Sequence, residues 1–582
     1  MTNDTFIDVM MRTAATAGEA RGIRFYSSPS DSEFRSYAAL DRQARADAAA
    51  LIARGHRAGE VVILAFDPGL AFIRALYATF YAGMIAAPVP VAAMRQPGAA
   101  LRRLEAIIAD SRSALVLTDG TALAAMGLEP GDTPAGAAVT QVSALGLPGA
   151  LTGDADAAGW APPPVTARSL ALLQYTSGST GTPKGVMVSH GNLVANEAAI
   201  TSAVGITSAS RTMGWLPHYH DMGLVGQLLQ PIFVGADSVL TSPSQFLRRP
   251  LLWLRLISEY RSTHTVGPDF AYGLCTRLVT DAQLAELDLS ALEGVITGAE
   301  PVRGTTLAAF SERFAAAGFD GRAFVPAYGM AETTLLVTAS VRSEPVAPIR
   351  VDAAGVEAGE LHDPSEDGKV AELVSCGPPA DGHEIVIVDP TSGLRAVEGA
   401  IGEILVRGPS VAQGYWDRPD ETERTFGASI VGDPVANRYL RTGDLGSLVD
   451  GELVITGRIK DLIIIRGRNL YPQDLETTAE ELLQSGCLSA AFEGLSSQPA
   501  VGLVAEVDSA RVPLEELERL AEAVRRSVVD EYTLPELGVV FIRKGTLPRT
   551  TSGKVQRALT RSLLADERLA TVLSLGFDRT AA

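Results

Sequence analysis

The chain has 582 residues, about four times a typical single domain of about 150 residues, so several domains are expected. Hydrophobic residues make up 46% of it and charged residues 20%, which fits a globular chain and excludes a largely disordered one. With 49 basic and 68 acidic residues the net charge is −19, which disfavours general nucleic-acid binding, because duplex phosphates need a broad basic face.

The cysteines and the N-terminus predict a cytoplasmic protein. An odd, sparse set of thiols is typical of a reducing compartment, and the three are widely separated: Cys275, Cys376 and Cys487. The first residues lack the basic-then-apolar order of a secretory signal. Residues 75–94 carry no charge over about the length of a membrane span. A glycine and two prolines inside this stretch instead favour a buried helix that ends near Gly83 and a short strand after it.

The first part of the chain alternates between helical and strand patterns. Residues 40–54 have helical periodicity, while 61–66 and 114–118 are continuous apolar runs typical of buried strands. Alternation of this kind predicts an α/β fold with largely parallel sheets. Residues 121–165 are rich in alanine, glycine and proline, so we expect a loop-rich connection there.

The next feature is an apolar strand that runs into a loop dense in glycines and hydroxyls, LLQYTSGSTGTPKG at 172–185. Glycines let backbone N–H groups turn inward, and the hydroxyls together with Lys184 add further donors and a positive charge. The loop therefore predicts a phosphate cradle. It is not a Walker A motif, because Pro183 precedes the lysine and the glycine spacing differs.

The pattern changes again in the last 240 or so residues. Residues 341–381 are short, turn-punctuated segments that indicate β-structure or an extended insertion. A domain boundary is expected near 458–461, followed by a strand at 462–465. The segment 514–532 predicts a helix with one apolar face, formed by Leu517, Leu520, Ala521, Val524 and Val528.

The loop at 172–185 resembles the phosphate-binding motif of the adenylate-forming enzymes, a superfamily of acyl-CoA synthetases, peptide-synthetase adenylation domains and luciferases. Further segments are similar to the family's other motifs and follow in the same order. They are GWLPHYHDMG at 214–223, GAE at 298–300, YGMAETT at 328–334, YLRTGD at 439–444, GRIKD at 457–461 and PRTTSGK at 548–554.

The resemblance implies an α/β fold in two parts. A large N-terminal domain, residues 1–459, would contain α/β subdomains and a β-rich subdomain and would bind ATP and substrate. A small mobile α+β domain, residues 460–582, would swing about Lys460 between two half-reactions.

The resemblance also assigns roles to individual residues. Lys554 matches the lysine that bridges the attacking carboxylate and the α-phosphate, and Glu332 matches the Mg²⁺ ligand. His220 matches a position beside the substrate carboxylate. Asp444, whose ionised carboxylate accepts hydrogen bonds, would bind the ribose hydroxyls, and Arg458 would be a second nucleotide contact.

The remaining nucleotide-binding positions follow from the same motifs. Gly298, Ala299 and Tyr328 match the lining of the adenine pocket, and Thr333 matches an α-phosphate contact. The other positions expected to contact ATP are Thr176, Ser177, Gly178, Ser179, Thr180, Gly181, Lys184, Glu300, Gly329, Met330 and Ala331.

Three local features resemble one branch of the family, the fatty acyl-AMP ligases. These are HDMGL at 220–224, RGRNLYPQD at 466–474 and extra residues at about 350–372. The resemblance implies that a fatty acid and ATP form an acyl-adenylate. The acyl group would then pass to the phosphopantetheine of a separate acyl carrier protein, or of a carrier domain of a polyketide or peptide synthetase. We hypothesise that the insertion, packed against the large domain, limits the swing of the small domain or blocks a path for coenzyme A.

Other functions stay open at this point. A long- or medium-chain fatty acyl-CoA synthetase is the main alternative, and a catalytically silent nucleotide-binding protein is another. A zinc site at His218, His220 and Asp221 is disfavoured because no further ligand cluster follows. Candidates for an acyl tunnel are Met222, Leu224, Leu228 and Leu229, and candidates for a basic carrier-docking patch are Arg466, Arg468 and Arg557.

Overall fold

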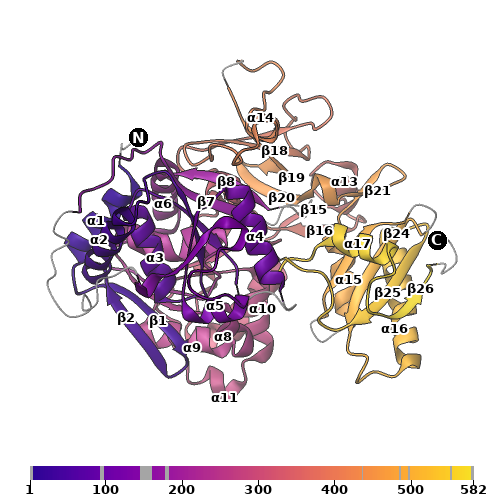
Figure 1. Ribbon diagram of the computed structural model, residues 1–582. Helices are drawn as coiled ribbons and strands as arrows, with labels where there is room; N and C mark the ends of the chain where they lie inside the picture. Colours follow the sequence, from indigo (N-terminus) through magenta and orange to yellow (C-terminus); the bar gives the residue numbers. More distant parts are fainter. Residues whose placement is uncertain are drawn as a thin grey trace.

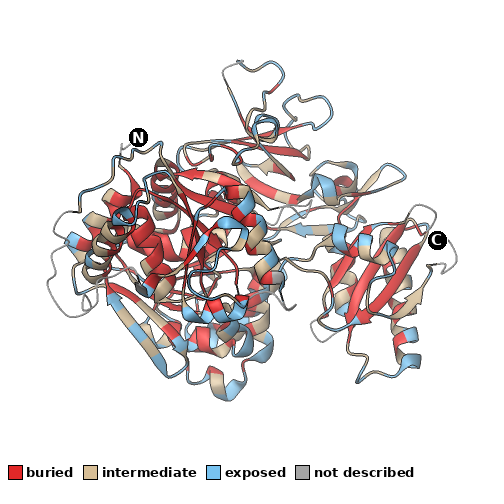
Figure 2. Cartoon of the chain, viewed as in Figure 1, coloured by how far each residue is buried: buried red, intermediate tan, exposed pale blue. Residues whose placement is uncertain are grey.

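The computed structural model describes residues 4–91, 98–144, 160–176, 183–434, 437–483, 487–495, 499–550 and 553–577. Two large sheets, each mostly parallel, form the centre of the larger part of the molecule, a four-stranded β-rich unit lies above them, and a small α+β unit follows at the C-terminus (Figure 1). Buried residues concentrate in these sheets and in the helices between them (Figure 2). The predicted α/β class with a β-rich part and a small α+β part is confirmed.

The first large sheet has six strands in the order β6-β5-β3-β4-β7-β8. All neighbours are parallel except the final pair. The strands are β3 (Val61–Ala65), β4 (Ile85–Val89), β5 (Leu115–Thr118), β6 (Ala138–Gln141), β7 (Leu170–Thr176) and β8 (Lys184–Ser189). The helices of this region are α2 (Tyr37–Ala53), α3 (Leu70–Tyr81), α4 (Ala99–Ser111) and α5 (Gly120–Met126).

The second large sheet has eight strands in the order β14-β13-β12-β11-β9-β10-β1-β2. They are β1 (Gly22–Ser28), β2 (Asp31–Ser36), β9 (Arg211–Gly214), β10 (Asp237–Thr241), β11 (His264–Gly267), β12 (Gly294–Thr297), β13 (Phe324–Gly329) and β14 (Leu336–Ala339). Its helices are α1 (Phe6–Ala17), α6 (His190–Val204), the π-helix η3 (Met222–Leu229), α7 (Gln230–Val234), α8 (Pro243–Arg248), α9 (Leu251–Tyr260), α10 (Asp269–Leu278), α11 (Asp281–Leu284) and α12 (Gly304–Phe314).

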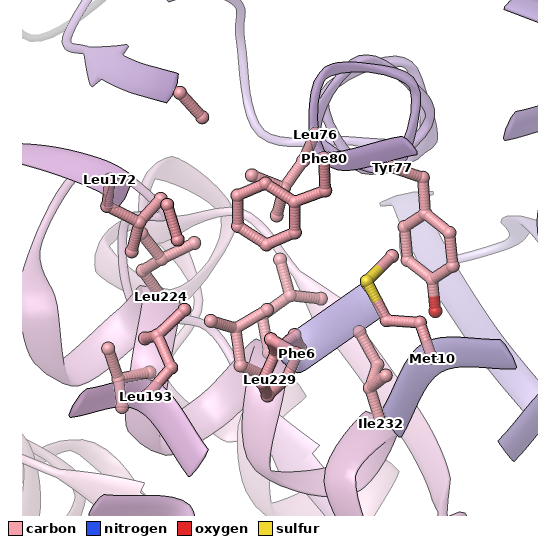
Figure 3. Packing of buried hydrophobic residues seen from close by; sticks show 14 of the residues in the cluster. Phe6, Met10, Leu76, Tyr77, Phe80, Leu172, Leu193, Leu224, Leu229 and Ile232 are labelled. Atoms are coloured by element: carbon pink, nitrogen blue, oxygen red, sulfur yellow. The ribbon is translucent and has the colours of Figure 1, made fainter. Parts of the chain in front are cut away.

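The largest hydrophobic core joins these two sheets. Side chains of α1, α3, α6 and η3 meet there, as Figure 3 shows for Phe6, Phe80, Leu193 and Leu224. One ion pair is buried beside it: Arg74 Nε of α3 lies 2.6 Å from Asp47 of α2, whose side chain has no exposed surface. The core therefore holds residues 224–229, which begin with the last residue of the HDMGL motif, between the two sheets.

The β-rich unit is an antiparallel sheet in the order β17-β18-β19-β20, with a hairpin beside it. Its strands are β17 (Glu384–Val388), β18 (Gly402–Arg407), β19 (Leu440–Val449) and β20 (Glu452–Arg458), with helix α14 (Pro419–Phe426). The hairpin, β15 (Ile349–Asp352) and β16 (Val370–Leu373), encloses α13 (Ala353–Ala358). The prediction of β-structure over 341–381 is thus confirmed except for the helix, which begins where the Asp352 carboxylate accepts the Gly355 N–H.

The C-terminal unit has a small hairpin, β21 (Ile463–Ile465) with β22 (Arg468–Leu470), and a four-stranded sheet in the order β23-β24-β25-β26. The sheet strands are β23 (Ser489–Glu493), β24 (Val501–Val507), β25 (Leu537–Arg543) and β26 (Thr571–Leu575). Its helices are α15 (Pro472–Leu483), α16 (Leu514–Tyr532) and α17 (Arg557–Ala565). The predicted helix 514–532 matches α16 at both ends, and its apolar face packs into the core of this unit.

One expectation for the large sheets is wrong in part. The region predicted as a loop-rich connection begins with α5 and β6, and β6 pairs in parallel with β5. The Asp119 carboxylate accepts a hydrogen bond from the Ala122 N–H and so caps α5. The alanines at the start of this region therefore form a short helix rather than a loop. Residues 145–159, which belong to the same prediction, lie outside the described part of the chain. Among the described residues, no helix is long and apolar enough to span a bilayer.

Candidate active site

A buried carboxylate joins the β-rich sheet to the eight-stranded sheet. Asp444 of β19 accepts a hydrogen bond from the Tyr328 hydroxyl at 2.7 Å, and Tyr328 comes from the end of β13. Arg458, opposite Asp444 in β20, places its Nε 2.7 Å from the other carboxylate oxygen. The negative charge of Asp444 raises the pKa of Arg458. Three residues predicted to bind nucleotide are therefore in direct contact, although they are far apart in the sequence.

The Gly298-Ala299-Glu300 segment follows β12, the neighbour of β13. A Cβ at Gly298 would lie 2.5 Å from the Ala327 carbonyl oxygen, so only glycine allows this close approach. Ala299 is in the left-handed region, with φ of 65°. Burial raises the pKa of Glu300 to about 7, and its carboxylate accepts the Phe270 N–H at 2.7 Å.

Glu332 lies in a short 3₁₀ turn, η6 (Ala331–Thr333), directly after β13. Its carboxylate accepts a hydrogen bond from the Tyr415 hydroxyl at 2.8 Å, and burial raises its pKa. The last residue of the turn, Thr333, anchors it, because the Thr333 hydroxyl donates to the Met330 and Leu335 carbonyls. Thr333 has no exposed surface, and its α-phosphate contact stays a prediction.

The backbone around this turn is tightly packed. A Cβ at Gly329 would overlap the Leu335 carbonyl, and Ala331 is buried in the largest core. The Met330 N–H donates to the Leu335 carbonyl, while its sulfur lies 4.0 Å from the Tyr328 hydroxyl. Contacts of Gly329 and Ala331 with any ligand would therefore come from their backbone rather than from side chains.

The two ends of the predicted phosphate loop are described. Thr176 ends β7 and pairs with Lys184, which begins the antiparallel strand β8. The Lys184 ammonium lies 3.1 Å from the Glu421 carboxylate and 5.5 Å from the centre of the Tyr415 ring. Tyr415 thus contacts both Glu332 and Lys184. The predicted loop positions between the two strands lie outside the described residues: Ser177, Gly178, Ser179, Thr180 and Gly181.

Lys554 of the C-terminal unit faces acidic residues of the large part. The loop before α17 extends toward the large sheets (Figure 1). Lys554 keeps exposed surface. Desolvation of its ammonium by the surrounding protein lowers its pKa, and the negative charges of Asp221, Glu300 and Asp444 oppose this shift. His220 Nδ1 lies 2.7 Å from the Asp221 carboxylate. Burial alone would raise the pKa of Asp221, but His220 and Lys554 hold it below its usual value.

The proposed pivot, Lys460, lies in the 3₁₀ turn η7 (Ile459–Asp461) and keeps exposed surface. Partial desolvation of its ammonium by the surrounding protein, together with the positive charge of Arg458, lowers its pKa. Next to this turn, Arg557 binds Glu476 at 2.6 Å and Asp461 at 3.3 Å. Arg468 likewise binds Glu357 at 3.0 Å, so Arg468 and Arg557 are not free cations for docking. Of the three suggested arginines, Arg466 alone is exposed without a described acidic partner.

The hairpin at 349–373 contacts the C-terminal unit. Its Val351 and Val356 pack on Tyr471, in a cluster that also includes residues of the β-rich unit. The Lys369 ammonium donates to the Glu531 carbonyl at 2.7 Å, and Arg468 binds Glu357 of α13. The insertion is thus a bridge between the two units, rather than a segment packed against the large part alone.

A small, partly open apolar pocket, with room for about one water molecule, includes Gly223 of the HDMGL segment in its lining. It is lined by Phe25, Pro68, Gly69, Phe72, Ile73, Leu216, His218, Gly223, Gln227, Leu228, Leu240 and Thr241. Among the four suggested tunnel residues, Leu228 lines it. Leu224 and Leu229 instead pack in the core shown in Figure 3, and Met222 belongs to a neighbouring core.

The described residues contain no group of three or more histidine, cysteine or acidic side chains arranged to hold a metal ion. His218, one residue of the disfavoured zinc site, is buried against Phe72, with ring centres 3.9 Å apart. A single carboxylate, Glu332, still suits Mg²⁺, which takes phosphate oxygens and waters for its remaining ligands. Burial raises the pKa of Glu332, so a cation there would favour its ionised form.

Sequence reasoning missed the partners of the predicted residues. Tyr415 contacts Glu332 and Lys184, and Glu421 pairs with Lys184, yet neither was proposed for a role. Asp221, which pairs with His220, was considered only as a ligand of the disfavoured zinc site. Asp221 stood next to a predicted residue in a motif, so its proximity could have been inferred. Tyr415 and Glu421 stand in a segment with no motif, and the chain fold alone brings them to the site.

Comparison with known proteins gives consistent matches. The AMP-binding enzyme family matches residues 12–416. The chain is 40% identical over 533 residues to the medium-chain-fatty-acid–[acyl-carrier-protein] ligase JamA of Moorena producens, covering 90% of this chain and 89% of JamA. It is 34% identical over 517 residues to the long-chain-fatty-acid–AMP ligase FadD28 of Mycobacterium tuberculosis, covering 86% and 87%. A solved structure from a study of fatty acyl-adenylate ligases of E. coli and L. pneumophila superposes with a TM-score of 0.86 at 31% identity, covering 97% of this chain and 98% of that one.

Proposed function

The chain belongs to the AMP-binding enzyme family, and from this we propose that it activates a fatty acid with ATP and loads it onto an acyl carrier protein. In the first step a carboxylate oxygen of the acid attacks the α-phosphorus, forming acyl-AMP and releasing pyrophosphate. In the second step the phosphopantetheine thiol attacks the acyl carbonyl and AMP leaves. The relatives named as carrier-protein and AMP ligases, matched over most of their length, support both steps.

One observation carries the first step. The Lys554 loop approaches Asp221, Glu300 and Asp444, so a cation from one unit meets the predicted nucleotide-binding residues of the other. Attack on an α-phosphate joins two anions, and a positioned ammonium stabilises the charge that develops between them. We propose that Lys554 bridges the carboxylate and the α-phosphate, with His220 beside the carboxylate.

The nucleotide would extend from Asp444 toward the phosphate loop. We propose that Asp444 accepts hydrogen bonds from the ribose hydroxyls, in exchange for or beside its present partners Tyr328 and Arg458. Tyr328 and the Gly298-Ala299 backbone would line the adenine pocket. Lys184 and the loop before it would hold the outer phosphates, with Lys184 leaving Glu421 to do so.

Glu332 would hold Mg²⁺ together with ATP phosphates. When bound, the ion would supply positive charge that offsets the charge on the phosphates. Tyr415 holds the Glu332 carboxylate by a hydrogen bond of 2.8 Å and so fixes its orientation. Because Tyr415 also contacts Lys184 at 5.5 Å, one side chain would coordinate the positions of the metal ligand and the phosphate-binding lysine.

The choice of acceptor would depend on the insertion bridge. We propose that residues 460–582 swing about Lys460 after adenylation, and that the insertion contacts at Glu357 and Lys369 restrain this swing. A restrained domain would favour a thiol delivered by a docked carrier protein over free coenzyme A. A cytoplasmic location is also proposed, because the three cysteines of the chain are few and lie far apart in the sequence.

Two assays test the proposal. Fatty-acid-dependent exchange of pyrophosphate into ATP reports the first step, and mass spectrometry of the acyl product with coenzyme A and holo carrier protein offered in parallel reports the second. We expect exchange with fatty acids and acyl transfer mainly to the carrier. No exchange with any chain length would refute adenylation, and comparable acyl-CoA formation would make the chain an acyl-CoA synthetase instead.

A further inference from the structure

Exposed apolar side chains gather along helix α10 in the large part of the molecule. Phe270, Leu274 and Leu278 recur at helical spacing on this helix, and Phe270 and Leu278 are 42% and 52% exposed. Leu247, at the end of α8, is 58% exposed. Large apolar side chains that are scattered over a surface are ordinary, whereas a contiguous group with a polar rim is typical of a protein-binding site.

Two contacts show that the end of α8 runs beside α10. The Phe246 ring centre lies 6.5 Å from that of Phe270, in the first turn of α10. The Cys275 thiol, in a later turn, lies 3.9 Å from the Pro250 carbonyl oxygen. Residues 247–249 connect these two contacts and therefore lie along the helix. Together with the exposed positions of α10 they form one surface, called here the α10 face.

The α10 face is positively charged, although the whole chain has a net charge of −19. Arg248 and Arg249 lie on its α8 side, and Arg277 lies near the C-terminal end of α10. All three are exposed, and none forms an ion pair with an acidic side chain of the described residues. Asp281, the first acidic residue after the helix, is held by Arg313 at 2.6 Å. The three arginine charges are therefore available to an acidic partner.

The α10 face begins at the candidate active site. The Phe270 N–H donates to the Glu300 carboxylate at 2.7 Å. Burial raises the pKa of Glu300, and the charge of Lys554, from the C-terminal unit, is among those that oppose this shift. From Phe270 to Leu278 the helix rises about 12 Å. A protein that docks on the α10 face would therefore lie next to the place where the two units meet.

We propose that the acyl carrier protein docks on the α10 face when it receives the acyl group. The inference rests on the proposed function, because that function supplies the carrier protein as the acceptor. Acyl carrier proteins are acidic, so the three arginines complement their charge and guide their approach, while the apolar side chains form the centre of the contact. A second copy of this chain fits less well, because a two-fold dimer brings the same basic surface of both copies together.

The test reverses the charge of the α10 face and measures acyl transfer to a holo acyl carrier protein, chosen from a panel as the one that the wild-type chain binds most tightly. The variant combines Arg248→Glu, Arg249→Glu and Arg277→Glu. A control with the same net charge changes three exposed arginines elsewhere: Arg57→Glu, Arg168→Glu and Arg424→Glu.

For the α10-face variant we expect kcat/KM for the carrier to fall about tenfold or more at low salt, mainly through KM. The difference from the wild-type chain should shrink as salt is raised, because salt screens charges on an exposed surface. Exchange of pyrophosphate into ATP, which needs no carrier, should not change, and the control should transfer acyl groups at the wild-type rate. Leu247→Ser with Leu278→Ser should weaken carrier binding about fivefold or more at every salt concentration.

Equilibrium binding of the carrier, measured by fluorescence anisotropy, separates this inference from the proposed function. If the carrier binds and the α10-face variant loses this binding, but the wild-type chain transfers no acyl group, the inference stands and the proposed transfer step fails. If the wild-type chain and the α10-face variant load the carrier equally, the inference is overturned and the proposed function stands. Self-association that the variant loses without any change in carrier loading would overturn it in favour of a second copy. Absence of binding to every carrier of the panel also overturns the inference, whatever the result of pyrophosphate exchange.

Discussion

Lys554→Ala is the substitution with the largest expected effect on catalysis. The ammonium lies near Asp221, Glu300 and Asp444 and supplies the positive charge that the C-terminal unit brings to the site. Removing one preorganised donor from a developing anion lowers kcat by about 10²–10³, or about 2.7–4 kcal/mol. The effect should fall on kcat more than on the KM for ATP, since the proposed contact forms in the transition state. Stability should change little, because Lys554 keeps exposed surface.

Pyrophosphate–ATP exchange with a saturating fatty acid measures this loss, and Lys544→Ala, which removes an exposed lysine of the same unit, is the matched control. The pH profile adds a second readout. Because the pKa of Lys554 is lowered, its ammonium loses its proton below the value of about 10.4 for a free lysine, and exchange should fall on that alkaline limb. Retention of more than half the wild-type exchange by Lys554→Ala would refute the assignment.

Three further substitutions test other parts of the structure. Asp444→Asn should weaken ATP binding about ten- to hundredfold by calorimetry, because it removes the charged acceptor proposed for the ribose; unchanged affinity would contradict that role. Glu332→Gln should raise the Mg²⁺ concentration for half-maximal exchange about tenfold or more, and an unshifted titration would argue against the metal site. Asp47→Ala leaves Arg74 without its buried partner and should lower the free energy of unfolding in urea by about 3–5 kcal/mol; a loss below about 1 kcal/mol would show that the pair is not a significant contributor.

Hydrophobic periodicity along the chain was sufficient to predict those helices and strands whose apolar positions are the ones buried in the fold. The helix at 514–532 was predicted at both ends because its apolar positions recur at helical spacing and all pack on one sheet. The short helix at 120–126 was missed, since seven residues rich in alanine give too little periodicity to outweigh the glycines around them. Its capping residue, Asp119, was the available signal.

The candidate site was predictable only as a set of motifs. Sequence order gave Tyr328, Asp444 and Arg458 as nucleotide-binding positions, but not that Asp444 holds the other two directly. Tyr415 could not be found, because its link to Glu332 depends on strand pairing between β8 and a distant loop. Contacts of this kind arise from tertiary packing and leave no local pattern in the chain.

The central claim is that a fatty-acid carboxylate attacks the α-phosphorus of ATP and that the acyl group then leaves AMP for a carrier thiol. A fatty acid labelled with ¹⁸O in its carboxylate tests this directly, in a reaction with ATP, Mg²⁺ and holo carrier protein. Attack at the α-phosphorus predicts that the released AMP contains one labelled oxygen and that pyrophosphate contains none. Unlabelled AMP, or label in the pyrophosphate, would contradict it.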